Sequence, residues 1–226
     1  MARMERRALR VTHTRLENWR NFTRVEVDLL RRVFLVGPNA SGKSNFLDVF
    51  RCLRDIVSVG GGFRQAIAKR GGVSRLRCLA ARRHPDIFLR VCIGDDQSPS
   101  AWEYELGFSQ DNLRRPIVKK ERVVKQGVEI LNRPDEKDKQ DAERLTQTYL
   151  EQVHANRGFR EIADFFLSVR YLHIVPQLVR EPNRSAGIRN DPFGGDFLEQ
   201  LASTQERTGN ARLRKIKRAL KFAVPQ

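Results

Sequence analysis

The chain has 226 residues, a length that suits one large domain or one domain with an insertion. No apolar run approaches the ~20 residues that a membrane-spanning helix needs, and no apolar stretch follows the basic N-terminus, which argues against a membrane anchor and a secretory signal. The 43 Lys and Arg residues exceed the 27 Asp and Glu residues, giving a net charge of +16. This excess indicates a polyanionic partner, with nucleic acid as the first candidate. The alternatives are a basic fragment whose acidic half is missing, or one that is merely solubilised by its charge.

The chain contains three cysteines, Cys52, Cys78 and Cys92, at spacings that do not suit a metal site. Their number is odd, which argues against a complete set of disulfides. We therefore expect buried, reduced thiols and a cytoplasmic protein.

Alternating apolar and polar residues predict two half-buried strands near the N-terminus, at residues 9–14 and 25–29, joined by a turn at residues 16–22. Residues 33–36 (V-F-L-V) are apolar without alternation. Such a run is typical of a central strand that is covered on both faces, so we expect it inside a sheet.

Residues 37–44 match the phosphate-binding loop pattern G-x-x-x-x-G-K-[ST] in full. The glycines allow a tight bend that points successive N–H groups at one anion, and the helix that starts near Gly42 adds the positive end of its dipole. Lys43 would reach the β- and γ-phosphates of ATP, and the Ser44 hydroxyl would bind Mg²⁺. The expected nucleotide contacts are Gly37, Pro38, Asn39, Ala40, Ser41, Gly42, Lys43, Ser44 and Asn45.

The helix after this loop is predicted from apolar residues at helical spacing, Phe46, Phe50, Leu53 and Val57. This stripe would fix residues 45–57 onto the sheet. Glycines at 60–62 and 71–72 would end the helix and bound a short helix at residues 63–69.

Three alternating segments, at residues 87–93, 102–108 and 117–124, are separated by turn-like linkers and predict an antiparallel meander. The charged stretch 132–144 is expected to form an exposed loop that runs into a helix ending near residue 153.

The last part of the chain is predicted to be mainly helical. Apolar spacing indicates a helix at residues 159–169, and the run 171–175 fits a strand of the main sheet that ends at Pro176. An Arg-rich loop follows as far as residue 192, and then two closing helices. On the last of these, Arg214, Arg218 and Lys221 share one face, which either binds a polyanion or is a plain solvent face.

Two stretches resemble a known family. The turn L-E-N-W-R-N-F at residues 16–22 between two strands, followed by G-P-N-A-S-G-K-S-N-F-L-D-V at 37–49, is similar to the start of SMC/RecF-type P-loop ATPases of the ABC class. This resemblance implies an α/β fold in which a mixed sheet surrounds the P-loop helix and an antiparallel β-subdomain is inserted. It implies ATP and Mg²⁺ as cofactors, and a second ATPase subunit or a further lobe as partner.

The resemblance also suggests roles for single residues. In the family a strand delivers a glutamine to Mg²⁺ and the attacking water, and Gln177, after the run 171–175, would take that role beside Lys43 and Ser44. An ordinary polar loop residue is the alternative for Gln177. The turn that contains Arg20 and Asn21 would lie near the nucleotide, with a solvated turn as the alternative.

Other parts of the family pattern are missing. A Walker B strand ending in Asp-Glu is not found, because the nearest imitation, at residues 88–96, alternates and carries Arg90. No Ser-Gly-Gly signature helix is present either. We therefore expect one N-terminal ATPase lobe over 1–226, with segments 1–58, 59–132 and 133–226 and without a C-terminal lobe.

The expected function is ATP binding, with hydrolysis once Walker B and signature elements complete the site, in DNA repair, chromosome maintenance or phage defence. One alternative is a P-loop kinase acting on a small molecule. The other is a non-catalytic nucleic-acid-binding fragment with a vestigial loop.

Overall fold

A computed structural model describes residues 9–80, 86–180, 191 and 193–223. The chain divides into two compact units, Met1–Val169 and Arg170–Gln226.

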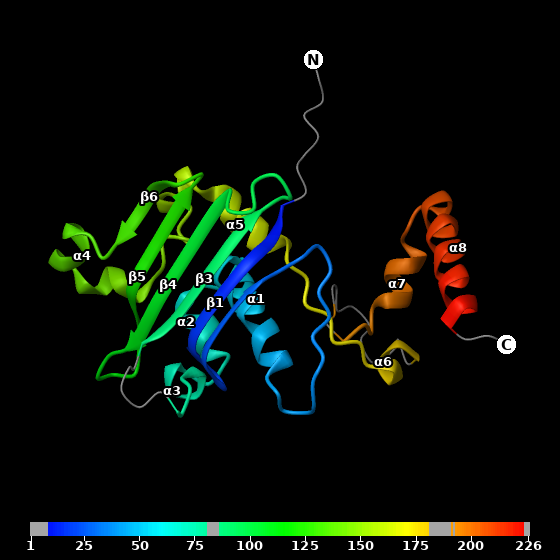
Figure 1. Cartoon of the computed structure of the whole chain (residues 1–226), viewed down its shortest axis with the longest axis horizontal. Coiled ribbons are helices and arrows are strands. Elements are labelled where there is room, and N and C mark those ends of the chain that lie inside the picture. Colours follow the sequence, from blue (N-terminus) through cyan, green and yellow to red (C-terminus); the bar gives the residue numbers. More distant parts are fainter. Residues whose placement is uncertain (1–8, 81–85, 181–190, 192, 224–226) are drawn as a thin grey trace, which may run out of the picture. The chain divides into compact units, whose positions relative to one another are not determined.

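The first unit is built on a six-stranded sheet whose order is β2-β1-β3-β4-β5-β6, and every neighbouring pair is antiparallel (Figure 1). The predicted N-terminal strands and the predicted meander therefore join into one continuous antiparallel sheet, and the predicted α/β class is confirmed. One strand, β6, was not predicted, because its sequence carries too little apolar alternation. The strands are β1 (Arg10–Trp19), β2 (Phe22–Asp28), β3 (Ile87–Gly94), β4 (Trp102–Gln110), β5 (Pro116–Lys125) and β6 (Val128–Arg133).

Rows of apolar side chains cross the sheet and explain its register. Leu16 on β1 pairs with Leu89 on β3, which pairs with Leu106 on β4, and all three are buried. Because side chains alternate along a strand, this register turns one whole face toward the core.

Helices α1, α2 and α5 cover one face of the sheet (Figure 1). The helical elements of the first unit are α1 (Lys43–Val57), α2 (Phe63–Ala68), α3 (Val73–Leu76), α4 (Glu136–Gln140), the 3₁₀ turns η1 (Ala142–Thr146) and η2 (Ala155–Gly158), and α5 (Arg160–Ser168). The second unit contains α6 (Pro176–Arg180), α7 (Phe197–Ala202) and α8 (Glu206–Ala223).

Helix α1 buries Phe46, Val49, Leu53 and Ile56 against the sheet. Each fully buried side chain of this kind stabilises the fold by roughly 1.5–3 kcal/mol, which anchors the helix firmly. The apolar stripe was therefore predicted on the correct helix but slightly rotated around its axis. Phe50 and Val57, which were predicted to belong to the stripe, lie only partly buried at its margin.

The structure differs from the predicted strand at residues 33–36. These residues form no strand, and all four are exposed, with exposed fractions of 86% for Phe34 and 92% for Val36. A central strand needs neighbours on both edges, but within the described residues β1 lies between β2 and β3, and β2 at the sheet edge pairs only with β1. An apolar segment is thus left beside the phosphate-binding loop without a partner.

Two later expectations also differ. Residues 171–175 form no strand and run directly into α6, with Leu172 63% and Ile174 53% exposed. The helix expected to end near residue 153 is replaced by η1, turns and η2. A cluster of buried charged side chains explains why this helix is missing. These side chains form hydrogen bonds with backbone groups that would otherwise pair within a helix.

In this cluster Arg133 is fully buried between two fully buried carboxylates. Its guanidinium donates to Glu121 at 3.0 Å and to Asp138 at 2.8 and 2.9 Å. Glu121 also accepts from the backbone N–H groups of Tyr149 and Leu150, at 2.8 and 3.0 Å. Burial raises the pKa of Glu121. Burial opposes ionisation of Asp138 too, but hydrogen bonds, above all from Arg133, outweigh it and lower the pKa of Asp138.

We predict that Arg133→Ala lowers the free energy of unfolding by about 3–5 kcal/mol, because it leaves two carboxylates buried without a cation. The matched control is Arg24→Ala, whose pair with Glu26 at 2.9 Å is exposed to water and should change the free energy of unfolding far less. Urea unfolding followed by circular dichroism measures both. Equal losses for the two variants would contradict the prediction.

Candidate nucleotide-binding site

Residues 37–44 form a loop that Lys43 closes from inside. Its Nζ atom donates to the carbonyl oxygens of Gly37 at 2.8 Å and Pro38 at 2.7 Å, and lies 3.4 Å from Ser41 Oγ. These contacts tie the end of the loop to its beginning. The ammonium group is thereby held at the centre of the bend, where a bound anion would meet it.

The backbone of the loop bends through left-handed conformations at Ala40, with a φ of 62°, and at Gly42, with a φ of 102°. Gly42 also allows a close approach, because a Cβ atom there would lie 2.6 Å from Asn21 Nδ2 and 2.7 Å from Phe22 Cζ. Glycine is therefore required at 42 for two reasons, its backbone conformation and the packing of the neighbouring turn.

The N-terminus of α1 opens into this loop without a cap. No side chain caps the helix, and its first turn carries no acidic residue. Within the described residues, the backbone N–H groups of Gly42, Lys43, Ser44 and Asn45 have no protein acceptor. Free N–H groups at a helix start, together with the helix dipole and an ammonium group, form a site for a phosphate chain.

The turn between β1 and β2 packs against the start of α1. The Trp19 indole Nε1 donates to the carbonyl oxygen of Asn45 at 2.8 Å, and Asn45 Nδ2 donates to Asn21 Oδ1 at 2.9 Å. Arg20 Nη2 donates to Asp48 on α1 at 3.2 Å. The structure thus brings Arg20, Asn21 and the P-loop together, while direct contact of Arg20 or Asn21 with nucleotide stays a prediction.

A buried arginine, Arg70, binds two acidic residues of α1. It donates to Asp48 at 3.0 and 3.1 Å and to Asp55 at 2.9 Å, so that both Asp48 oxygens are occupied. Sequence reasoning missed this anchor. The signal was available, because acidic residues seven apart lie on one face of a helix and both face inward in a strongly basic chain. Between them, burial raises the pKa of Cys52 to about 12, so its thiol stays neutral.

The remaining predicted residues do not join the site. Gln177 lies in α6 of the second unit, so its role toward Mg²⁺ stays a prediction. Asp95 accepts from the backbone N–H groups of Gln97 and Ser98 in the turn after β3, which agrees with its rejection as a Walker B residue.

A separate cavity of about 570 Å³ lies beyond the C-terminal end of α1, with Gly62, Arg64, Arg114 and Glu151 in its lining. Both Glu151 oxygens are taken by backbone N–H groups, from Phe63 at 2.5 Å and from residue 148 at 2.9 Å. Residues 37–44 do not line this cavity, so it is not the nucleotide site.

The described residues contain no helix that is long and apolar enough to cross a bilayer. They also contain no group of three or more His, Cys, Asp or Glu side chains that could hold a metal ion.

The α/β fold and the phosphate-binding loop at the start of α1 define an ATP-binding domain of the P-loop ATPase class. Residues 32–221 match the family described as "AAA domain, putative AbiEii toxin, Type IV TA system", and the chain belongs to this family.

Solved structures of the recombination mediator protein RecF in the RecFOR pathway are also similar. The structure described as RecF-ATP shares 18% identity at a TM-score of 0.36, over 55% of this chain and 29% of RecF. The one described as RecF-ATPrS shares 21% identity at a TM-score of 0.33, over 54% of this chain and 28% of RecF. This chain therefore matches less than a third of the length of those proteins. A search of curated proteins found no match.

We predict that Gly42→Ala weakens ATP binding at least tenfold and destabilises the fold by about 1–3 kcal/mol, because its Cβ strains the backbone and pushes Asn21 and Phe22 away. The matched control is Ala40→Gly, which relaxes a left-handed residue and should keep full affinity. Isothermal titration with Mg-ATP measures the affinities. Wild-type affinity in the Gly42→Ala variant would show that the turn does not pack as described.

Proposed function

We propose that this chain is the ATP-binding lobe of an SMC/RecF-like ATPase. The observation that carries the proposal is the group of unpaired N–H groups at the start of α1, arranged around the ammonium group of Lys43. Four donors and one cation at a single helix terminus suit a triphosphate better than a single carboxylate or a neutral ligand.

In this proposal each residue has a defined task. The N–H groups of residues 42–45 bind the phosphate oxygens, and Lys43 exchanges part of its contacts with Gly37 and Pro38 for contacts to the β- and γ-phosphates. The exposed Ser44 hydroxyl is an oxygen donor suited to Mg²⁺, which usually takes few protein ligands beside phosphates and water. Bound Mg-ATP supplies the transferable phosphoryl group and the cation that balances its charge.

Hydrolysis would need groups from elsewhere. Asp48 is the first acidic residue after the loop, and Arg20 and Arg70 occupy its carboxylate. It is therefore not available as a base for water. We propose that Walker B and signature elements come from a further lobe or a second subunit. We also propose that part of this partner binds to the exposed residues 33–36.

The biological setting is also a proposal. The family description names a putative AbiEii toxin and a type IV TA system, which favours phage defence over DNA repair or chromosome maintenance for this chain. The small-molecule kinase is less well supported, since that class requires a parallel sheet and the described sheet is antiparallel throughout.

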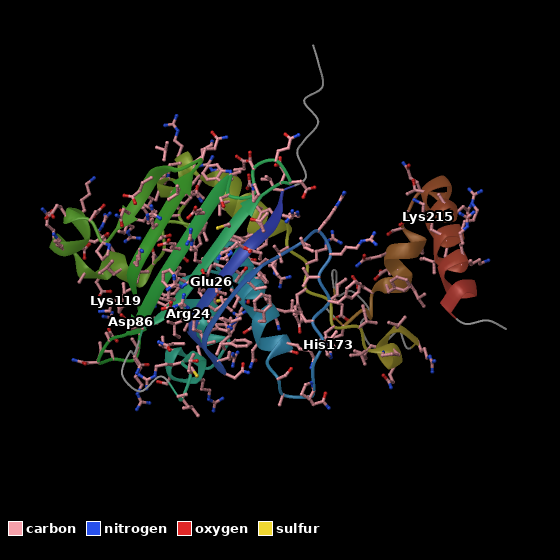
Figure 2. The ribbon with its side chains drawn as sticks, viewed as in Figure 1. Arg24, Glu26, Asp86, Lys119, His173 and Lys215 are labelled. Atoms are coloured by element: carbon pink, nitrogen blue, oxygen red, sulfur yellow. The ribbon has the colours of Figure 1, made fainter. Side chains whose placement is uncertain are left out.

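We predict that Lys43→Ala weakens Mg-ATP binding by roughly 10–100-fold, the effect of losing a charged hydrogen bond of about 1.5–3 kcal/mol. The matched control is Lys119→Ala, which removes an exposed lysine of β5 and should bind as wild type (Figure 2). Titration with a fluorescent ATP analogue measures both. Identical affinity in wild type and Lys43→Ala, or no saturable binding at millimolar ATP, would overturn the proposal.

We predict that the chain alone hydrolyses ATP roughly 10²–10⁴-fold more slowly than a completed ATPase, because Arg20 and Arg70 already hold the carboxylate of Asp48, which is therefore not free to act as the base. Phosphate release is measured for the chain alone and after addition of the polypeptide encoded next to it. Stimulation that disappears in Lys43→Ala is expected. Turnover by the chain alone at the usual enzymatic rate of about 10 s⁻¹ would contradict the need for a partner.

A further inference from the structure

The cavity beyond the C-terminal end of α1 has a volume of about 570 Å³ and lies apart from the P-loop. Its lining comes from three parts of the first unit: residues 61–65 and 68 around the start of α2, residues 114–116 at the start of β5, and Gln147 with Glu151 in the turns after η1. Cavities of roughly 300–1,000 Å³ are typical of sites for small organic molecules. The side chains of the lining therefore indicate which kind of molecule would fit.

Three arginines line this cavity, and two of them have no counter-charge. Within the described residues, the exposed side chains of Arg64 and Arg114 make no hydrogen bond and no ion pair. The third, Arg115, donates from Nε to Asp111 at 2.8 Å and from Nη1 to Glu143 at 2.9 and 3.1 Å. The cavity thus holds two unbalanced positive charges beside a third guanidinium group that carboxylates fix in place.

The backbone at Arg114 is strained. Its φ is 61°, in the left-handed region that glycine adopts readily and that other residues adopt at a cost. The turn is also tied down, because Asp111 accepts from the N–H groups of Arg114 and Arg115, at 3.0 and 2.8 Å. A glycine would form this turn with less strain, so the arginine at this position points to a use for its side chain.

The other polar groups of the lining are mainly hydrogen-bond donors. Gln147 Oε1 accepts from Gln152 Nε2 at 3.2 Å, which leaves the Gln147 NH₂ group without an acceptor among the described residues. Glu151 is the acidic residue of the described lining, and both of its oxygens already accept backbone N–H groups. Burial raises the pKa of its carboxyl group, so a further positive partner is not required to hold it. This excess of donors suits a ligand rich in oxygen acceptors.

We infer that this cavity binds the phosphate group of a small phosphorylated molecule. Guanidinium groups bind phosphate oxygens through paired hydrogen bonds, and Arg64 and Arg114 are available for such pairs. A phosphate monoester carries a charge of about −1.5 to −2 near pH 7, which balances the two free cations. A carboxylate has a single charge and would leave one of them unbalanced.

The size of the cavity adds a second constraint on the ligand. A volume of about 570 Å³ is more than a free phosphate ion fills, so the remaining space would hold the organic part of the molecule. The inference does not rest on ATP binding, because residues 37–44 do not line this cavity.

The test is a titration of the ¹⁵N-labelled full chain with phenyl phosphate, followed by amide NMR signals, in wild type and in Lys43→Ala. Saturable shifts are expected at residues 64, 65, 114 and 115 in both proteins, whatever happens at residues 42–44. Inorganic phosphate lacks the organic part and benzoate lacks the second charge, so each should bind roughly tenfold more weakly than phenyl phosphate.

A double variant, Arg64→Gln with Arg114→Gln, should weaken phenyl phosphate binding by roughly 10–100-fold, because it removes both free guanidinium groups. The matched control is Lys119→Gln with Arg157→Gln, which removes the same charge from exposed residues of β5 and η2 and should bind as wild type. Circular dichroism checks that both variants stay folded.

A single variant, Arg114→Gly, separates binding from folding. It relaxes the left-handed backbone, so the midpoint of thermal unfolding should stay the same or rise, while phenyl phosphate binds several times more weakly. A residue with a purely structural role would not give this combination.

Several outcomes would overturn the inference. Amide signals around the cavity that stay unmoved at millimolar phenyl phosphate, or that move only at residues 42–44, would show that the cavity is not a phosphate site. An equal loss in the control variant would show that net charge acts without a site. Benzoate or inorganic phosphate binding as tightly as phenyl phosphate would rule out a site for phosphorylated organic molecules.

Discussion

The candidate site depends on the contact between the β1–β2 turn and the start of α1. Trp19 donates to the carbonyl oxygen of Asn45, and Asn21 accepts from the Asn45 side chain. The ring of Phe22 comes within 2.7 Å of the position that a Cβ of residue 42 would take. These contacts fix the helix terminus relative to the sheet. The N–H groups that begin α1 are therefore held in place before any ligand binds, which lowers the ordering cost of binding.

Ion pairs also hold the same helix. Arg70 bridges Asp48 and Asp55, and it is only 5% exposed in its side chain. Breaking such a bridge leaves buried carboxylates without a partner, so α1 is strongly fixed along its length. A rigid helix with a free N-terminus suits repeated binding and release of a phosphate chain, because the scaffold need not refold around each ligand.

The position of the loop and of the helix after it could be predicted from the sequence, because their determinants are local. The loop from Gly37 to Ser44 and the apolar stripe of α1 lie within a few turns of one another, and the turn at Arg20 follows a recognisable pattern. The predictions failed where structure depends on distant partners. Residues 33–36 have the composition of a central strand, but composition cannot supply the neighbouring strands. The buried cluster around Arg133 could not be predicted from the sequence either, because a charged residue normally indicates an exposed surface.

The central claim is that the N–H groups at the start of α1 and the ammonium group of Lys43 bind a nucleoside triphosphate. The most direct measurement is a titration of ¹⁵N-labelled protein with Mg-ATP, followed by amide NMR signals. Saturable shifts are expected for the amides of Gly42, Lys43 and Ser44, with amides of the β5–β6 edge unchanged. If the signals of residues 42–44 stay unmoved at millimolar Mg-ATP, or if only signals elsewhere shift, the account is wrong.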